Sequence, residues 1–299
     1  MNSKRFGREF PLHLMVLPSF ILVLIFSYGP ILGLIIAFKK YSLVKGIFGS
    51  KWNGFENYTY LFQMPDIWIV IRNTVYIAIL KILAGLIVPI TVALLLNEIR
   101  MERFKRWIQT MIYLPHFLSW IILGGILIDI LSPSSGIVNQ LLGVFGIDPI
   151  FFLGSNHWFA NVMVTSDVWK EFGFSTIVYL AALTGINPSL YEAAVIDGAN
   201  RWKQTMNVTL PGMAPIIVLL GTLSLANVLN AGFDQIYNLY SPQVYESGDI
   251  IDTWVYRLGI QQAQYSLATA VGLLKSFVSV ILISSSYYLA YKWANYRIF

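Results

Sequence analysis

The sequence has no cysteine and little charge, since Asp, Glu, Lys and Arg make up only 12% of its 299 residues. The absence of cysteine excludes disulfide bridges, thiol catalysis and thiolate metal ligands. Soluble domains contain roughly 25% charged residues, whereas this chain is 57% hydrophobic. The composition therefore predicts a membrane protein. The formal net charge of +5 comes from dispersed basic residues, which indicate membrane topology rather than nucleic-acid binding.

Catalytic and metal-binding patterns are also missing. The sequence has no GxxxxGK[ST] phosphate-binding loop, so the chain cannot hydrolyse ATP by itself. Its three histidines, His13, His116 and His157, are scattered and do not predict a metal site. His116 follows Pro115 in an apolar run and is expected to pack or bridge between helices. We predict a chain that is not an enzyme, with no metal and no cofactor of its own.

Six apolar segments are long enough to cross a bilayer, which takes about 20 residues. The first follows a basic N-terminus and exceeds the apolar core of about 7–15 residues in a signal peptide, so it is expected to remain as a span. The polar and aromatic stretch 39–66 is predicted to be an external loop. We expect an all-α membrane protein with a single transmembrane domain over residues 1–299 and six transmembrane helices at about 11–38, 73–97, 107–130, 159–183, 216–239 and 267–291.

An even number of spans places both termini on the same side of the membrane. Lysine and arginine favour cytoplasmic segments, and cytoplasmic termini give the larger share of basic residues to the inside. The inside set is Lys4, Arg5, Arg8, Arg100, Arg103, Lys105, Arg106, Arg201, Lys203, Lys292 and Arg297. The outside set is Lys39, Lys40, Lys45, Lys51, Arg72 and Arg257. The excess predicts that both termini are cytoplasmic.

Residues 187–211, between the fourth and fifth predicted spans, form a polar segment that we call the elbow. Asn187 is a suitable N-cap for a first helix. Gly198 can end that helix because glycine readily adopts a positive φ. Asn200 can then cap a second helix, so the pattern predicts two short helices joined at a glycine. Such an element, held between apolar segments, suits docking into a cleft of another protein.

The elbow resembles the EAA–G–LP motif of ABC-importer permeases at the same spacing. The matching residues are Glu192, Ala193, Ala194, Asp197, Gly198, Ala199, Leu210 and Pro211. The resemblance implies a type I ABC importer permease fold in which these residues, with Arg201, couple the permease to an ATPase. It further implies a second homologous permease subunit, two ATPase subunits that hold ATP and Mg²⁺, and an extracytoplasmic solute-binding protein.

The resemblance extends to carbohydrate-importer permeases of the maltose type over about residues 12–297. It is carried by Arg72-Asn73-Thr74, Leu94–Asn97, Leu114-Pro115-His116-Phe117, and Trp169 with Gly173. The stretch Asn230–Ile260 resembles the branch that serves polysaccharide-derived oligosaccharides, including uronate-rich ones. The chain lacks the large external insert of the maltose permease, so details of that protein are not carried over. The resemblance implies an oligosaccharide importer of the bacterial cell membrane that works by alternating access.

Three lysines fall inside predicted spans, namely Lys81, Lys170 and Lys275. Each lies about 8–11 residues from the outer end of its span, or roughly 12–16 Å at 1.5 Å per residue. Intramembrane charges are costly and face a cavity or one another, and four carboxylates lie at comparable depth, Asp129, Asp167, Glu171 and Asp234. Two interpretations stay open. Either ion pairs fix the helix bundle, or an unpaired lysine, Lys170 being favoured, selects anionic sugars.

Sugar sites combine aromatic platforms with hydrogen-bonding side chains, because a pyranose has an apolar C–H face and a polar rim. The predicted substrate path therefore joins the three lysines to Trp169, Glu171, Phe172, Phe233, Asp234, Gln235, Tyr237 and Asn238. For each aromatic residue, core packing or a place in the interfacial aromatic belt is the competing interpretation.

Two other functions are compatible with the sequence. One is an ABC permease for neutral sugars or another small solute, which uptake competition would distinguish. The other is an ion-driven secondary carrier, which the buried Lys and Asp residues would allow. Such carriers contain internal repeats, and this sequence has none that we find; a carrier would also leave the elbow unexplained. We predict import of oligosaccharides, with acidic, uronate-containing fragments favoured.

Overall fold

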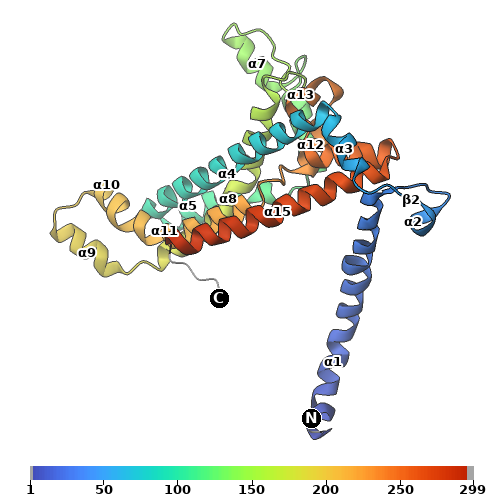
Figure 1. The fold of residues 1–299 in the computed structure, drawn as a ribbon. Coiled ribbons are helices and arrows are strands. Elements are labelled where there is room, and N and C mark those ends of the chain that lie inside the picture. The colour runs from blue at the N-terminus through green and yellow to red at the C-terminus, as the bar shows by residue number, and fades with distance from the viewer. Residues whose placement is uncertain (1–2, 295–299) are drawn as a thin grey trace. The chain divides into compact units, whose positions relative to one another are not determined.

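The computed structural model describes residues 3–294, and nearly all of its regular structure is helical (Figure 1). The predicted all-α class is therefore confirmed. Internal contacts divide the chain into two compact units. The first comprises Met1–Met64 and Val255–Leu274, and the second comprises Pro65–Trp254 and Lys275–Phe299.

The first unit opens with one long apolar helix whose geometry changes along its length. An α-helix, a π-helical turn and a 3-10 helix follow each other without a gap as α1 (Ser3–Val23), η1 (Leu24–Tyr28) and η2 (Gly29–Phe38). Pro18 lies inside α1 and Pro30 at the start of η2. Proline lacks an N–H donor and crowds the preceding turn, which accounts for irregular geometry near these positions.

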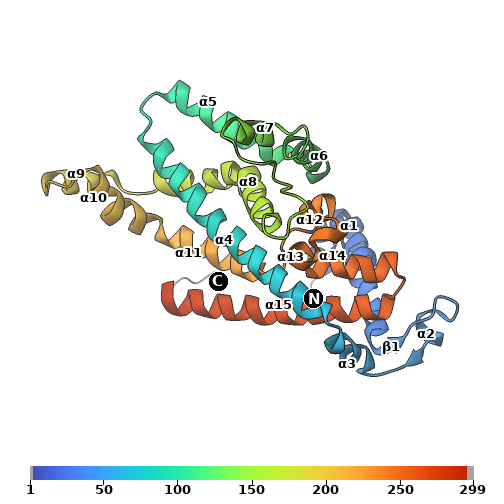
Figure 2. The same cartoon turned by 90° about the horizontal axis from the view of Figure 1, so that it is seen from above.

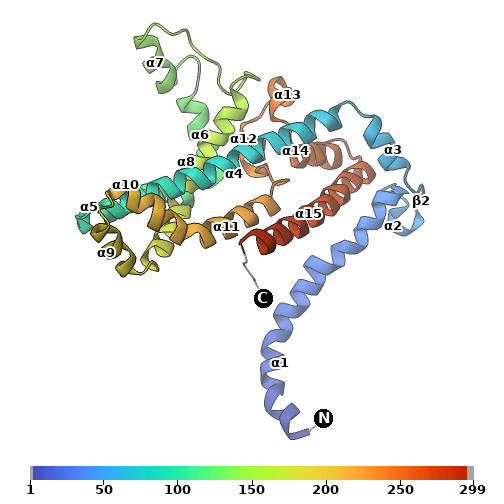
Figure 3. The same ribbon diagram turned by 60° about the vertical axis from the view of Figure 1, so that its left-hand side comes forward.

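A short antiparallel hairpin follows, in which β1 (Lys39–Lys40) pairs with β2 (Lys51–Trp52) around the single turn α2 (Gly46–Gly49) (Figure 3). The next helix is α3 (Glu56–Gln63). Its buried Asn57 donates from Nδ2 to the carbonyls of Ala37 at 2.7 Å and Lys39 at 3.2 Å. The stretch expected to be a loop thus has a fixed local fold.

The second unit holds most of the remaining helices. In chain order the elements after α3 are α4 (Asp66–Glu98), α5 (Glu102–Tyr113), η3 (Leu114–Phe117), α6 (Trp120–Ile130), α7 (Ile137–Val144), α8 (Phe159–Thr184), α9 (Pro188–Ile196), α10 (Arg201–Gln204), η4 (Thr205–Thr209), α11 (Leu210–Ala226), α12 (Phe233–Leu239), η5 (Pro242–Val244), α13 (Tyr245–Gly248), α14 (Ile251–Tyr256), η6 (Arg257–Gln261) and α15 (Tyr265–Ala294). α14 and α15 each extend across the boundary between the units, and η6 belongs to the first unit.

The apolar core of the second unit lies where α4, α8 and α11 meet. The buried side chains there are Ala93, Tyr179, Leu183 and Met213. Gly173 brings α8 against the end of α5, because any side-chain carbon at this position would overlap the backbone carbonyl of Ile112. Close backbone approach at small residues is typical of helix packing in lipid, where burial of apolar surface drives association only weakly.

Among the described residues, four helices are long and apolar enough to cross a membrane: Phe10–Phe38, Asp66–Glu98, Arg201–Ala226 and Tyr265–Tyr288. A bent pair, Glu102–Phe117 and Trp120–Ile130, is a fifth candidate. The fourth predicted span corresponds to α8, which has 26 residues but includes Asp167, Lys170 and Glu171. By length and composition the structure therefore supports four or five spans, and six remains a prediction.

The third predicted span, 107–130, is not one straight helix. Its two parts are bent by 102°. Pro115 lies in the 3-10 turn η3, Leu118 is extended, and the Ser119 hydroxyl caps α6 by accepting from the N–H of Ile122 at 3.3 Å. Proline interrupts the α-helical hydrogen bonds, and serine as an N-cap starts a new helix.

The fifth predicted span, 216–239, also differs from the expectation of one helix. Continuous helix runs from Arg201 to Ala226, the chain then turns, and α12 begins after Gly232. Gly232 has a φ of 99°, a conformation that favours glycine. The Asn227 side chain donates to the carbonyl of Leu223 at 3.1 Å, and such local bonds compete with helix propagation.

The tripeptide Arg72-Asn73-Thr74 ties the start of α4 to the segment 245–251. Asn73 donates from Nδ2 to the carbonyls of Glu246 at 3.0 Å and Asp249 at 3.2 Å. The Thr74 hydroxyl accepts from the N–H of Ile251 at 2.9 Å. A motif that the sequence marks only by resemblance thus satisfies backbone groups of a segment more than 170 residues further along the chain.

We predict that Gly232→Ala destabilises the protein. The substitution strains a left-handed backbone by about 1–2 kcal/mol and places a methyl group 2.8 Å from the Lys81 ammonium. Gly221→Ala is the matched control, because a methyl group there meets only Leu86 Cδ1 at 3.7 Å. Thermal stability of the solubilised assembly, followed by size-exclusion chromatography after heating, should fall only for Gly232→Ala. Equal midpoints for the two variants would refute this role of Gly232.

Candidate functional site

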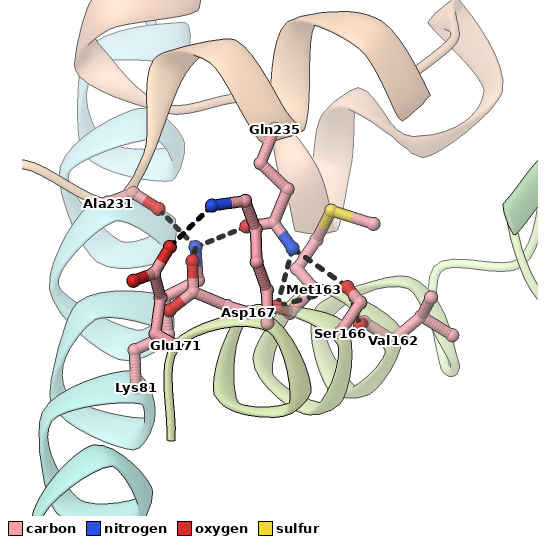
Figure 4. A network of polar contacts seen from close by, with 9 residues as sticks. Lys81, Val162, Met163, Ser166, Asp167, Glu171, Ala231 and Gln235 are labelled. Atoms are coloured by element: carbon pink, nitrogen blue, oxygen red, sulfur yellow. Dashed lines mark hydrogen bonds and ion pairs between the residues drawn. The ribbon is translucent and has the colours of Figure 1, made fainter. Parts of the chain in front are cut away.

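The ammonium group of Lys81 lies in the interior of the second unit, where it joins three segments (Figure 4). It donates to Asp167 Oδ1 on α8 at 3.1 Å, to the carbonyl of Ala231 at 2.8 Å, and to Gln235 Oε1 on α12. An ammonium has three N–H donors, so these three acceptors saturate it. Only 9% of the Lys81 side chain is exposed, and the pair with Asp167 makes its burial tolerable.

Gln235 completes this network from the other side. Its Nε2 donates to the carbonyl of Met163 and to the Ser166 hydroxyl, both at 2.8 Å. Ser166 in turn donates to the carbonyl of Val162 at 2.6 Å. Gln235 is fully buried, and its amide is engaged by Lys81 and α8. It therefore positions α12 against α8, and its side chain is not available to a sugar.

Lys170 does not have the unpaired ammonium on which the predicted selection of anionic sugars depended. It is 6% exposed, donates to Glu171 Oε1 at 2.7 Å and to the carbonyl of His116 at 3.0 Å, and lies 5.6 Å from the ring centre of Trp120. The His116 ring contacts Glu171 Oε2 at 2.7 Å and stacks on Phe174. The expectation of a free Lys170 is wrong, because the neighbouring carboxylate on the next residue neutralises it.

Lys275 is paired as well, but with a carboxylate that the sequence did not nominate. Its ammonium contacts Asp252 Oδ1 at 2.5 Å and donates to Asn230 Oδ1 at 2.8 Å. Asp252 lies on α14, which was expected to be loop. All three intramembrane lysines therefore have carboxylate partners, and ion pairing is the interpretation that the structure supports.

A polar cavity of about 400 Å³ lies next to the Lys81 network. The amide of Asn230 donates to Asn227 Oδ1 at 3.3 Å while its own oxygen accepts from Lys275, so Asn227 and Lys275 together fix its orientation. The polar lining residues are Lys81, Asp167, Ser175, Ser224, Asn227 and Asn230, and the others are Ala78, Ile82, Gly85, Leu220, Leu223, Ala231 and Gly232. This cavity offers amide and hydroxyl groups beside one neutralised ion pair.

Ser175, Ser224, Asn227 and Asn230 are cavity residues that the sequence reasoning missed. A signal for them was present, because polar side chains inside an apolar segment are costly and usually face a cavity or a partner. The two asparagines are neither aromatic nor charged, and the prediction of the path used only aromatic and charged residues with their neighbours. Asn230 nevertheless begins the motif stretch Asn230–Ile260, and Asn227 lies three residues before it.

The predicted aromatic platform does not assemble around this cavity. Trp169 lines a separate and largely apolar groove of about 360 Å³ with Phe152 and Trp158. Phe233 and Tyr237 stack on each other with ring centres 5.3 Å apart. The remaining predicted residues are the half-buried Phe172, the exposed Asp234, and Asn238, which donates to the carbonyl of Asp234 at 2.6 Å. Of the predicted path, Lys81 lines the cavity directly and Lys275 reaches it through Asn230.

The elbow has the local structure that its sequence predicts. The Asn187 side chain accepts from the N–H of Ser189 at 3.1 Å, and that of Asn200 accepts from the N–H of Lys203 at 2.9 Å. Gly198 has a φ of 74°. The turn η4 is π-helical, which was not expected, and α11 continues directly from it with Pro211 in its first turn. Figure 2 shows α9 and α10 beyond the end of α8 and the start of α11.

The elbow exposes large apolar side chains. Val195 is 61% exposed, Ile196 86% and Trp202 68%. Behind them a groove of about 610 Å³ separates α9, α10 and η4 from the end of α4. Arg201 crosses it to Glu98 at 3.6 Å, and both side chains are largely exposed, so this pair contributes little stability. An exposed apolar surface of this kind marks an interaction site.

The described residues contain no group of three or more His, Asp or Glu side chains arranged to hold a metal ion.

Removal of one partner from the buried ion pair should be costly. We expect Lys81→Met to lower stability by about 3–5 kcal/mol, the cost of stranding one partner of a buried pair, and Lys81→Met with Asp167→Leu to recover part of this loss. Lys45→Met, at an exposed lysine, is the control. The measurement is the unfolding midpoint of the purified assembly in detergent. If the double variant is no better than the single one, the charge pair is not the cause.

Known proteins that are similar to this chain point to the same family as the motif in the elbow. The family model for the binding-protein-dependent transport system inner membrane component matches residues 82–298. The polygalacturonan/rhamnogalacturonan transport system permease protein YteP of Bacillus subtilis is 40% identical over 288 residues, which cover 96% of this chain and 90% of that relative. Protein LplB of the same organism is also 40% identical, over 96% of this chain and 91% of its own length.

Solved structures agree over the whole length. A bacterial ABC transporter involved in the import of the acidic polysaccharide alginate contains a chain with a TM-score of 0.90 and 39% identity, over 97% of this chain and 98% of that one. A bacterial alginate ABC transporter in complex with an alginate pentasaccharide-bound periplasmic protein gives a TM-score of 0.88 at 39% identity, over 97% and 96%. The predicted ABC-importer permease fold is confirmed. Since the family model covers most of the chain, this protein belongs to the binding-protein-dependent transport system inner membrane components, the permeases of ABC importers.

Proposed function

We propose that this chain is a permease subunit of an ATP-driven importer of acidic oligosaccharides in the bacterial cell membrane. Two similar proteins support the substrate class, the polygalacturonan/rhamnogalacturonan permease and the permease of the alginate importer. Polygalacturonan, rhamnogalacturonan and alginate all contain uronates. The observation that carries the proposal is the match to the alginate-importer permease along 97% of this chain; the polar cavity beside Lys81 is compatible with sugar hydroxyls.

The proposed membrane topology has six spans with cytoplasmic termini. It adds α8, the fourth span along the chain, to the five candidates described above. The 26 residues of α8 give a length of about 39 Å at 1.5 Å per residue, enough to cross the hydrocarbon core of about 30 Å. Its three central charges are compatible with the membrane because each has an opposite charge within 3.1 Å. The charge asymmetry of the loops supports the cytoplasmic position of both termini and of the elbow.

Substrate recognition in this chain rests on hydrogen-bonding side chains rather than on an unpaired cation. The Lys81–Asp167 pair that lines the cavity is neutral as a unit. Asn227, Asn230 and Ser224 offer donors and acceptors to sugar hydroxyls. Preference for carboxylate-bearing sugars then arises elsewhere in the assembly, in the second permease subunit or the solute-binding protein. The similar alginate transporter is in complex with such a protein, a periplasmic protein that holds an alginate pentasaccharide.

The elbow is the coupling element of the proposed importer. Its exposed Val195, Ile196 and Trp202 would enter a groove on a separate ATPase subunit, and two such subunits hold the ATP and Mg²⁺. Closure of the ATPase pair on ATP would move the two elbows as rigid levers. The helices joined to them, α8 and α11, would then shift the cavity between inward- and outward-facing states.

Coupling should depend on the left-handed turn at Gly198. Gly198→Val places a β-branched residue at positive φ, which costs about 1–2 kcal/mol and tilts α10, so substrate-stimulated ATP hydrolysis and uptake should fall sharply. Gly198→Asn is the control, because asparagine tolerates this conformation, and no neighbouring atom lies within 4 Å of an added Cβ. Glu192→Ala should reduce coupling less. Wild-type ATPase stimulation in Gly198→Val would contradict the coupling role.

Substrate preference is tested with the reconstituted assembly and its solute-binding protein. A uronate-containing oligosaccharide should stimulate ATP hydrolysis more than its carboxyl-reduced counterpart. Asn230→Ala should weaken stimulation by both sugars to a similar extent, since its amide recognises hydroxyls. Gln262→Ala, at an exposed amide outside the cavity, should have no effect. Equal stimulation by both sugars in the wild type would favour a neutral-glycan permease, and a loss confined to the acidic sugar in Asn230→Ala would assign charge recognition to this cavity.

A further inference from the structure

The hairpin at residues 39–52 carries an apolar tip that nothing in its own unit covers. Val44 is 96% exposed, Phe48 94% and Leu43 67%. Isolated apolar side chains on a surface need no explanation, but three large ones on a single turn form a patch that marks an interaction. None of the elements in the proposed transport cycle uses this patch.

The tip is held in this conformation by its own hydrogen bonds. The Lys39 ammonium donates to the carbonyl of Ile47 at 2.8 Å. The Ser50 hydroxyl accepts from the N–H of Ser42 at 3.0 Å and donates to the carbonyl of Gly46 at 2.6 Å. The Ser50 hydroxyl therefore holds the fold of the hairpin, and Ser42 contributes its backbone N–H. The apolar side chains are presented by a structured turn and not by an irregular loop.

The charge of the hairpin has one sign. Lys40, Lys45 and Lys51 are exposed around the tip, and no Asp or Glu occurs between residues 39 and 55. With the Ser50 hydroxyl engaged, the side chains that the tip offers to a partner are mainly ammonium groups and hydrocarbon, with the one hydroxyl of Ser42. That combination fits a surface with phosphate groups above an apolar layer, and it lacks the varied hydrogen-bonding groups of a protein interface.

The base of the hairpin lies where two membrane-capable helices end. β1 follows directly on the span Phe10–Phe38. The Ser266 hydroxyl, near the start of the span Tyr265–Tyr288, accepts from the N–H of Tyr41 at 3.0 Å and donates to the carbonyl of Lys39 at 2.7 Å. Both span ends thus fix the hairpin at the boundary of the hydrocarbon layer. Lys45 follows Lys40 by five residues, so its Cα lies at most about 17 Å from that of Lys40. The tip therefore stays close to the boundary at which the base is fixed.

Aromatic residues surround this base in the manner of an interfacial belt. Phe38 stacks on Trp52 at 5.9 Å and meets Phe55 and Tyr58 edge-on or tilted. Trp52 is 58% exposed, and burial raises the pKa of the Tyr58 hydroxyl. Tryptophan and tyrosine gather at the headgroup level of membranes because their rings are amphipathic.

We propose that the hairpin 39–52 is a lipid-binding element. Leu43, Val44 and Phe48 enter the bilayer surface, and Lys40, Lys45 and Lys51 contact the phosphates of anionic phospholipids. The leaflet is the outer one in the topology proposed above. The inference does not depend on the substrate, because it concerns only the first unit and the membrane.

The absence of cysteine in this chain permits a direct test. Phe48→Cys carries a nitroxide spin label in the full assembly, built with partner chains that lack reactive cysteines, in nanodiscs of phosphatidylglycerol and phosphatidylethanolamine. Relaxation by oxygen, which concentrates in lipid, is compared with relaxation by a water-soluble nickel chelate. Leu32→Cys in the span and Asp148→Cys, at an exposed residue after α7, are the lipid and water references. The label at position 48 should show the oxygen-dominated relaxation of position 32.

The role of charge is tested in the same assembly. Replacing Lys40, Lys45 and Lys51 together by Gln, or using phosphatidylcholine alone, should raise the nickel accessibility of position 48 several-fold. Nickel accessibility equal to that of position 148 in anionic nanodiscs would overturn the proposal. So would protection that arises only when the substrate-loaded binding protein is added, because the hairpin would then be a protein-docking site. Transport activity does not enter the readout, so failure of the proposed substrate class leaves this result unaffected.

Discussion

The burial of the Lys81 ammonium is the constraint on which the interior of the second unit depends. A charge in a membrane interior is unfavourable unless a counter-charge and hydrogen bonds compensate it. Asp167, the Ala231 carbonyl and Gln235 meet that requirement together, and they come from α8, from the turn after α11 and from α12. The position of one ammonium therefore fixes three segments against α4. Gly232, left-handed and next to the Lys81 Nζ, is the residue that lets the chain come so close.

The same constraint decides what the cavity can recognise. Each intramembrane lysine is neutralised by a carboxylate, Lys81 by Asp167, Lys170 by Glu171 and Lys275 by Asp252. The Lys81 ammonium, which lines the cavity, is saturated by three acceptors and has no donor left for a substrate carboxylate. The relatives named for acidic polymers and the neutral cavity are reconciled if this chain contacts sugar hydroxyls while other subunits read the charge. Lys275 then acts through Asn230, whose amide it orients toward Asn227.

Helix α4 connects the elements of the second unit. Near its start, Asn73 and Thr74 hold the backbone of segment 245–251. Lys81 organises the cavity about two turns further on, about 12 Å along the axis from Asn73 at 1.5 Å per residue. At its last turn Glu98 meets Arg201 of the elbow across an open groove. The contacts at the two ends differ in strength, because those near the start of α4 are buried and the pair at its end is exposed.

The sequence alone determined the membrane class, the elbow with its caps at Asn187 and Asn200 and its turn at Gly198, and the permease family, because these depend on composition and on neighbours within a few residues. It also placed the lysines inside helices that need counter-charges. Tertiary structure decided the pairing. Asp252 lies 23 residues from Lys275, on a helix of 6 residues that is too short for a periodic pattern to predict. It also decided the bend at Ser119 and the break at Gly232. Hydropathy averages over such short irregularities, whereas the break at Gly232 is held by Lys81, which lies 150 residues before Ala231 and donates to its carbonyl.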